Sequence, residues 1–284
     1  MDRAGAPHSK ETDRAGADFL ARYPGYTGTR VLDELRATEY SRLDRQRHVY
    51  LDYTGGTLYA ASQLARHQAL LADHIYGNPH SHSPASLAMT ERVESARSSV
   101  LRYFNASPDE YFVIFTQNAS GALKHVGECY PFGPGSRYLL TYDNHNSVNG
   151  IREFARARGA AVTYAPVAAA DLRIERGPLS AELARPSAEG HNLFAFPAQS
   201  NFSGVQHPLE LIEEAQAAGW DVLLDAAAFV PTNRLDLGRW KPDLACISFY
   251  KLFGYPTGVG CLLMRKPMFG KLRRPWFAGG TVQI

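Results

Sequence analysis

The sequence predicts an α/β protein in which a mostly parallel sheet carries helices on both faces. From about residue 111 onward, short apolar segments alternate with segments whose apolar residues recur at helical spacing. Strands that alternate with helices favour a parallel sheet, because each crossover helix packs against the sheet. The chain has 284 residues, 45% of them hydrophobic, which is enough for one large domain and part of a second.

Strands and helices alternate along this part of the chain. We expect strands at 111–116, 137–142, 160–167, 192–199, 221–229, 244–250 and 258–265. Helices are expected between them at 120–130, 146–159 and 208–219. Ligands of such sheets bind at the carboxyl ends of the strands, so the residues that follow each strand are the first candidates for a site.

The part of the chain before residue 111 is predicted to be largely helical. We expect a frayed polar extension first, then a helix at 23–47, a short strand entering a glycine turn at 48–59, and helices at 62–76 and 87–104 around the turn-rich 77–86. The predicted organisation is an extension (1–22), an N-terminal segment (23–80), a large domain (81–265) and the start of a connection to a further domain (266–284).

Composition excludes several classes of function. The formal charge is +2 and no basic run occurs, so no nucleic-acid partner is expected. No run of about 18 apolar residues and no secretory signal is present, which predicts a cytoplasmic protein with no membrane partner. The three cysteines are far apart, and the histidines 74, 80 and 82 lack a matching ligand pattern, so neither a disulfide framework nor a metal site is predicted.

A turn after the first of these strands has the composition of a phosphate site. Small and hydroxylated residues, among them Ala119 and Ser120, open the following helix. The free N–H groups and the dipole of a helix start favour an anion there. Asn118 or Ser120 could equally be an ordinary helix cap.

Two further strand ends carry polar residues. His145 follows strand 137–142, where an imidazole can lie over an aromatic ligand and exchange protons near neutral pH. Asn201 follows strand 192–199 and could donate to a ring substituent. Taken singly, they could also be a loop histidine and a turn asparagine.

The last two strand ends carry opposite charges in apolar surroundings. Asp225 follows three apolar residues, and a buried carboxylate is costly without a cation or hydrogen bonds. Lys251 lies between apolar strands in a chain with only six lysines, and burial lowers the pKa of an amine as Schiff-base chemistry requires. Ser248 precedes it and could bind phosphate. Alone, Asp225 could cap a helix and Lys251 could reach outward to solvent.

The phosphate-type turn, the histidine, the asparagine, the buried aspartate and the buried lysine follow five strands in chain order. Together they indicate a binding site more specifically than any one of them does. The segments around them then show a resemblance to a known family. The most telling are YLDYTGGTLYAASQL, GNPHSHSPAS, YFNASPDEY, NHNSVNGIREFA, NFSGVQHPLEL, SFYKLFGYPTGVG and FAGGTV. From about residue 49 to residue 282 the chain resembles the class V enzymes that use pyridoxal 5′-phosphate (PLP), typified by cysteine desulfurases, and above all the N-terminal desulfurase domain of molybdenum cofactor sulfurases.

The resemblance implies the large domain of a fold-type I PLP-dependent transferase and a role for each matching residue. Lys251 would hold PLP as a Schiff base, Asp225 would keep the pyridine nitrogen protonated, His145 would stack on the ring and Asn201 would contact its phenolic oxygen. The phosphate would be bound by Ala119, Ser120 and Ser248, with Tyr250 nearby, and by Thr281 of a neighbouring subunit in a homodimer.

Two departures from the family pattern stand out. Ala228 occupies a position where desulfurases carry a glutamine, so the tuning of the cofactor is expected to differ. The chain also stops before the small C-terminal domain that in this family carries the persulfide cysteine and the arginine for the substrate carboxylate. The three cysteines of the chain are poor substitutes, because Cys246 and Cys261 lie in predicted core strands and Cys129 lies at the end of the helix after the phosphate turn.

The activity implied by the resemblance is PLP-dependent desulfuration of L-cysteine, through an enzyme persulfide, with release of alanine to leave sulfur for an acceptor. Two alternatives stay open on the sequence. One is another class V reaction, such as transamination or C–S lysis, because the same cofactor serves all of them. The other is a truncated protein that keeps the fold without catalysis.

Overall fold

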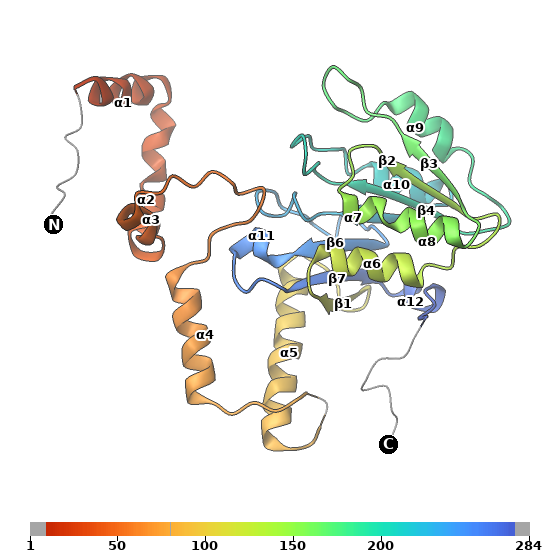
Figure 1. Ribbon diagram of the computed structural model, residues 1–284, viewed down its shortest axis with the longest axis horizontal. Coiled ribbons are helices and arrows are strands. Elements are labelled where there is room, and N and C mark those ends of the chain that lie inside the picture. The colour runs from red at the N-terminus through yellow and green to blue at the C-terminus, as the bar shows by residue number, and fades with distance from the viewer. Residues whose placement is uncertain (1–9, 80, 276–284) are drawn as a thin grey trace. The chain divides into compact units, whose positions relative to one another are not determined.

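The computed structural model describes residues 10–79 and 81–275, and its centre is one seven-stranded sheet (Figure 1). The strands are β1 (Tyr111–Thr116), β2 (Arg137–Thr141), β3 (Ala161–Ala165), β4 (Asn192–Pro197), β5 (Asp221–Asp225), β6 (Leu244–Ser248) and β7 (Gly260–Arg265). They lie in the order β1-β7-β6-β5-β4-β2-β3, and β7 runs antiparallel to both of its neighbours while the other pairs are parallel. The predicted mostly parallel sheet is confirmed.

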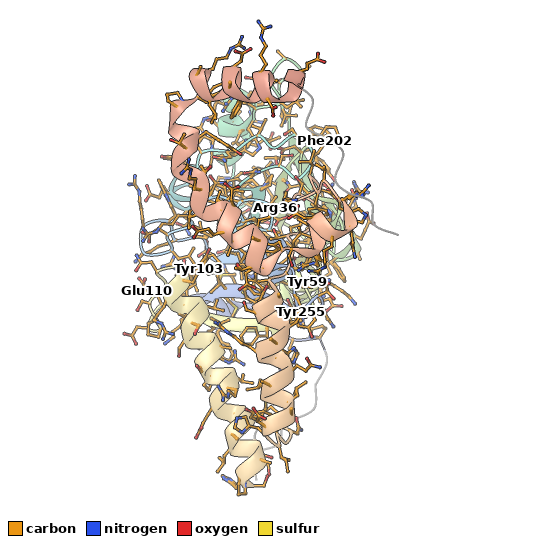
Figure 2. The ribbon with its side chains drawn as sticks, turned by 90° about the vertical axis from the view of Figure 1, so that its left-hand side faces the viewer. Arg36, Tyr59, Tyr103, Glu110, Phe202 and Tyr255 are labelled. Atoms are coloured by element: carbon orange, nitrogen blue, oxygen red, sulfur yellow. The ribbon has the colours of Figure 1, made fainter. Side chains whose placement is uncertain are left out.

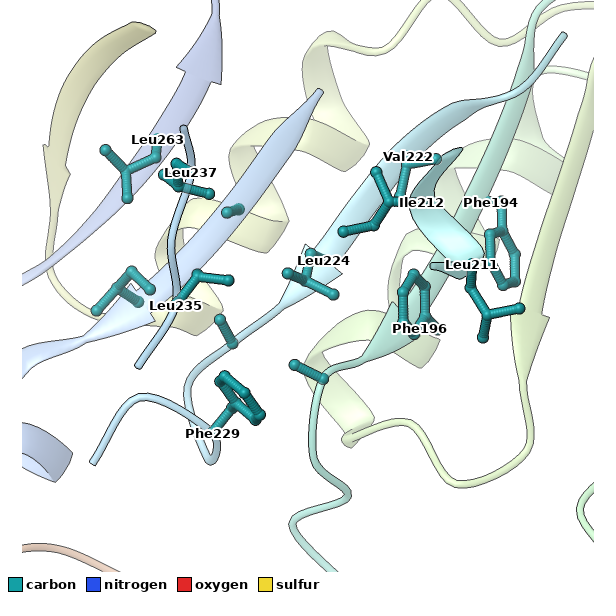
Figure 3. Packing of buried hydrophobic residues seen from close by; sticks show 14 of the residues in the cluster. Phe194, Phe196, Leu211, Ile212, Val222, Leu224, Phe229, Leu235, Leu237 and Leu263 are labelled. Atoms are coloured by element: carbon teal, nitrogen blue, oxygen red, sulfur yellow. The ribbon is translucent and has the colours of Figure 1, made fainter. Parts of the chain in front are cut away.

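Helices cover both faces of the sheet because the central strands are apolar on both sides. All six residues of β4 are buried, and its side chains alternate between two cores. Phe194 and Phe196 pack with Leu211 of α10 on one face (Figure 3), whereas Leu193 packs with the core that α6 and α8 cover on the other. A strand buried on both faces is typical of a parallel sheet between two helical layers.

The helices that follow β1 are α6 (Ala119–Cys129), α7 (Asn146–Asn149), α8 (Ile151–Ala157), α9 (Arg176–Leu183), α10 (Leu211–Ala217), α11 (Phe249–Phe253) and α12 (Pro267–Lys271). The expected helix at 146–159 is present but divided at Gly150. The sequence analysis missed α9, α11 and α12, since two of them have only five residues and show no resolvable helical period.

The earlier part of the chain contains α1 (Lys10–Arg22), the 3₁₀ helix η1 (Pro24–Thr29), α2 (Arg30–Glu39), α3 (Arg42–Gln46), α4 (Ala61–Asp73) and α5 (Pro84–Tyr103). The expectation of a frayed extension is therefore wrong for residues 10–22. The predicted helix at 23–47 is broken into three pieces, of which α2 and α3 are joined by a 2.7 Å ion pair between Arg36 (Figure 2) and Asp44.

The strand predicted within 48–59 is wrong. No strand of the described residues pairs with this segment, and Val49 and Leu51 are 85% and 83% exposed. Its backbone is held elsewhere, since Thr57 N–H donates to the Tyr250 carbonyl and the Thr57 hydroxyl donates to the Lys251 carbonyl. Alternation of apolar and polar residues predicts a strand only where a partner edge is available, and the sequence does not show that edge.

The Cα positions divide into two units. The first contains Met1–Leu51 and Tyr59–Gln68, and the second contains Asp52–Leu58 and Ala69–Ile284 with the whole sheet. The domain boundaries drawn from the sequence stay a prediction. Within residues 10–79 and 81–275, no helix combines the length and the apolar character that crossing a membrane requires.

Candidate active site

Eight of the nine residues singled out from the sequence line one cavity at the carboxyl ends of the strands. They are Ala119 and Ser120 after β1, His145 after β2, Asn201 after β4, Asp225 at the end of β5, and Ser248, Tyr250 and Lys251 after or at the end of β6. The cavity encloses about 410 Å³, part of it open to solvent. Thr281, the ninth, lies outside the described residues, as does His80.

The start of α6 forms the end of the cavity suited to an anion. Asn118 caps the helix by accepting the Gly121 N–H through Oδ1 at 2.9 Å, and the Ala119 N–H donates to Ser248 Oγ at 2.8 Å. The hydroxyls of Ser120 and Ser147 are 2.5 Å apart. Three hydroxyls therefore meet the positive end of a helix dipole, which is the composition of a phosphate site.

Gly260 of β7 allows this helix start to lie against the sheet. A Cβ at position 260 would lie 2.5 Å from the Ile247 carbonyl oxygen and 2.6 Å from the Cα of Asn118. Both are backbone atoms, so neither can turn away. The close approach of β6, β7 and the start of α6 needs glycine here.

We expect Gly260→Ala to destabilise the chain by about 1–3 kcal/mol, as overpacking of a filled core does. Urea unfolding followed by circular dichroism measures the change. Gly270→Ala in α12 is the matched control, because nothing lies within 4 Å of a Cβ there. Equal stabilities of the two variants would contradict the steric argument.

His145 begins α7 at the rim of the cavity. Its side chain is exposed, and its Nδ1 accepts the Ser147 N–H at 3.2 Å and lies 2.9 Å from Ser147 Oγ. The imidazole is thus oriented by the same serine that contacts Ser120. A ring in this place can cover one face of a flat ligand in the cavity.

Asp225 is the buried carboxylate of the site, with 7% of its surface exposed. Its Oδ1 accepts the Ala227 N–H at 3.0 Å. Burial raises the pKa of Asp225, while the Ala227 N–H and the nearby His145 and Lys251 oppose that rise. The net direction means that the charge of this carboxylate is incompletely compensated in the free chain, and a cationic ligand group would compensate it.

Lys251 approaches the same space from α11, with 8% of its surface exposed. Its Nζ donates to Asn201 Oδ1. Burial lowers the pKa of the Lys251 ammonium, and Asp225 opposes this only in part. A lysine with a lowered pKa holds more of its amine in the nucleophilic form near neutral pH than a surface lysine does.

The structure adds cavity residues that the sequence analysis missed. Ser147 and Gln199 line it together with Leu123, Pro197 and Ala227, and Ala228, noted above as a departure from the family pattern, lines it too. Ser147 could have been suspected from its position two residues after His145, because the side chain of a helix-cap residue accepts an N–H from the first turn, and here it is that of Ser147. Gln199 carries no such signal, because only the end of β4 turns it toward the cavity.

None of the three cysteines lines the cavity. Cys246 and Cys261 are buried in β6 and β7, and burial raises the pKa of both thiols, that of Cys261 to about 12. Burial also raises the pKa of Cys129, the last residue of α6. A raised thiol pKa disfavours the thiolate, so these side chains are poor nucleophiles. The described residues contain no cluster of three or more metal-ligating side chains.

Comparisons with known proteins place this site in a family context. A model of the family described as aminotransferase class V matches residues 49–284. Molybdenum cofactor sulfurase of Oryza sativa subsp. japonica is 41% identical over 301 residues, covering 93% of this chain and 36% of that protein. The human molybdenum cofactor sulfurase is 42% identical over 274 residues, covering 90% of this chain and 30% of that protein. The chain thus spans about a third of the length of these relatives.

Solved structures share the fold. The apo structure of a cysteine desulfurase from Thermococcus onnurineus NA1 superposes with a TM-score of 0.78 at 22% identity, covering 89% of this chain and 61% of that one. A cysteine desulfurase from Escherichia coli superposes with a TM-score of 0.72 at 25% identity, covering 89% and 62%. The large-domain fold expected from the sequence is confirmed.

Proposed function

Because the chain belongs to the class V aminotransferase family, we propose that it binds PLP in the cavity and forms the cofactor-binding part of a cysteine desulfurase-like enzyme. The observation that carries the proposal is the meeting of an amine, a buried carboxylate and a helix start in one cavity. These groups arrive from the ends of β1, β5 and β6 and have no common structural task.

The residues present fit the chemistry of this cofactor. PLP offers an aldehyde to an amine, a protonatable ring nitrogen to a carboxylate, and a phosphate to a helix start. Lys251, Asp225 and the N-terminal turn of α6 supply those three partners in one cavity. When bound, the cofactor supplies an electron sink for a substrate carbanion.

Each residue then has a proposed task of its own. Lys251 holds the cofactor covalently and afterwards moves the Cα proton of the substrate. Asp225 keeps a proton on the ring nitrogen, and His145 covers the ring. Asn201 orients the Lys251 amine, to which it is already hydrogen-bonded, and contacts the phenolic oxygen.

Ala119, Ser120 and Ser248 bind the phosphate of the cofactor. Tyr250 lies beside them. Thr281 of a neighbouring subunit joins this site in the proposed homodimer, which acts in the cytoplasm. Ser147 is added to the phosphate end because its hydroxyl lies 2.5 Å from that of Ser120.

The proposed substrate is L-cysteine. An enzyme thiol takes the substrate sulfur, so that cysteine and the thiol become alanine and a persulfide, and the persulfide then passes its sulfur to an acceptor. The balance needs no external oxidant or reductant. The similarity to the Escherichia coli cysteine desulfurase, at 25% identity, supports this substrate, and the thiol is not assigned to any of the three cysteines of this chain.

The proposal is tested on the purified chain and on the protein isolated from its source. The chain should gain visible absorbance with added PLP, and the isolated protein should release alanine from L-cysteine. Pyruvate in place of alanine would indicate C–S lysis and overturn the desulfurase assignment. A chain that stays colourless at excess PLP would overturn the cofactor assignment.

A further inference from the structure

A buried pair, Asp143 and His207, lies in the two loops that carry His145 and Asn201 and has no part in the proposed chemistry. The Oδ2 atom of Asp143 is 2.6 Å from Nε2 of His207, and the side chains are only 5% and 1% exposed. A carboxylate accepts hydrogen bonds, so His207 carries a proton on Nε2 and donates it. Charge-assisted hydrogen bonds of this kind are among the strong ones in proteins.

The pair joins the loops that carry two residues of the site. Asp143 stands two residues before His145, in the loop after β2. His207 closes the turn that begins after β4, where its N–H donates to the Ala198 carbonyl, and Asn201 lies inside this turn. The turn also presents Phe202 outward, with 89% of its surface exposed (Figure 2).

Further hydrogen bonds fix both members of the pair. The second carboxylate oxygen of Asp143 accepts from Thr141 Oγ1 at 2.8 Å. The Ser200 hydroxyl donates to the Asp143 carbonyl at 3.2 Å, which is a second link between the two loops. Asp143 is therefore held from β2 and from both ends of the turn after β4.

We propose that Asp143 and His207 are positioning residues, which set His145 and Asn201 at the separation that a flat ligand between them requires. The inference rests on the proposed function for the identity of that ligand. Its physical content is preorganisation: the two loops are joined before the ligand arrives, so binding need not order them. Asn201 transmits the same constraint to Lys251 through the hydrogen bond to Nζ.

The test replaces His207 with leucine and with glutamine. His207→Leu removes the donor, whereas His207→Gln keeps an N–H that can reach Asp143. We expect the leucine variant to bind PLP about tenfold more weakly or worse, since a lost hydrogen bond to a charged group is worth roughly that factor. The glutamine variant should recover most of the affinity, measured by absorbance titration at a temperature where circular dichroism shows every variant folded.

Tyr130→Phe is the matched control. The Tyr130 hydroxyl lies 2.5 Å from Oδ2 of Asp221 and is also buried. Asp221, however, is the first residue of β5, so it lies at the end of the strand opposite to the cavity. This variant should lose stability and keep its PLP affinity. Unchanged affinity in folded His207→Leu, or an equal loss in Tyr130→Phe, would overturn the positioning role.

Hydrogen exchange of the ligand-free chain separates this inference from the proposed function. His207→Leu should speed hydrogen exchange in peptides covering 143–147 and 199–207. Tyr130→Phe should leave the exchange of these peptides unchanged. If the wild-type chain fails to bind PLP, the proposed function falls while exchange still decides the coupling of the loops. Should His207→Leu not fold, Ser200→Ala removes the second link, and unchanged exchange in that variant would also overturn the inference.

Discussion

Lys251→Ala is expected to abolish the covalent attachment of PLP and the visible absorbance that accompanies it. Lys251 is the lysine that the described cavity presents, its pKa is lowered by burial, and it is oriented by Asn201. Alanine keeps the fold but has no amine. Borohydride reduction followed by peptide mass spectrometry should find the cofactor on Lys251 in the wild-type chain and on no peptide of the variant.

Lys271→Ala is the matched control for this experiment. Its Nζ is also partly buried and lies 2.6 Å from Asp221, but at the far edge of the sheet. The control should keep both absorbance and label. A reduced PLP adduct in Lys251→Ala, or its loss in Lys271→Ala, would contradict the assignment of Lys251.

The pH dependence of attachment follows from the same lowered pKa. The reactive form is the free amine, so the rate of attachment rises with pH up to the pKa of Lys251 and levels above it. Because burial places that pKa below the ordinary 10.5, the rise should end at lower pH than for a surface lysine. Stopped-flow absorbance across the alkaline range measures the profile.

Asp225→Asn should weaken PLP binding by roughly 30-fold or more, the effect of removing one partner of a buried, hydrogen-bonded charge pair. An asparagine of nearly the same shape can still accept the Ala227 N–H but carries no charge for a ring nitrogen. Absorbance titration measures the affinity. Alanine release from L-cysteine should be lost together with the affinity.

Asp225→Asn should weaken PLP binding but stabilise the folded, ligand-free chain. The folded state raises the pKa of Asp225 above its ordinary 3.8, so the folded chain holds this proton more tightly than the unfolded chain. Stability contributed by that proton is present at low pH and is lost as pH rises through the window between the two pKa values. Above that window, Asp225→Asn should gain stability relative to the wild-type chain, as urea unfolding at several pH values will show.

Asp243→Asn is the control for the loss of PLP affinity. Burial also raises the pKa of Asp243, but its carboxylate is hydrogen-bonded by Gln216 and Val222 just before β6, at the edge of the sheet away from the cavity. It should leave PLP affinity unchanged. Equal losses of affinity in the two variants would refute a specific role for Asp225.

Predictions from the sequence succeeded where a local pattern is coupled to burial. The strands β4 and β5 are apolar runs between turn residues, and burial on both faces leaves little alternative to a parallel sheet. They failed where pairing decides the outcome, as in the segment 48–59, which has the alternation of a strand and no partner edge. The short α11, which carries Lys251, was missed, and its first two residues were assigned to the preceding strand.

The sequence by itself determined the fold class and the identity of most cavity residues, because residues that follow parallel strands must meet at one edge of the sheet. Only the tertiary structure decided how Lys251 is held, which hydroxyls gather at α6, and that Asp143 and His207 form a buried pair. These contacts join residues 50, 27 and 64 positions apart. Spacing along the chain contains no information about such distances, since the register of strands and the course of loops set them in space.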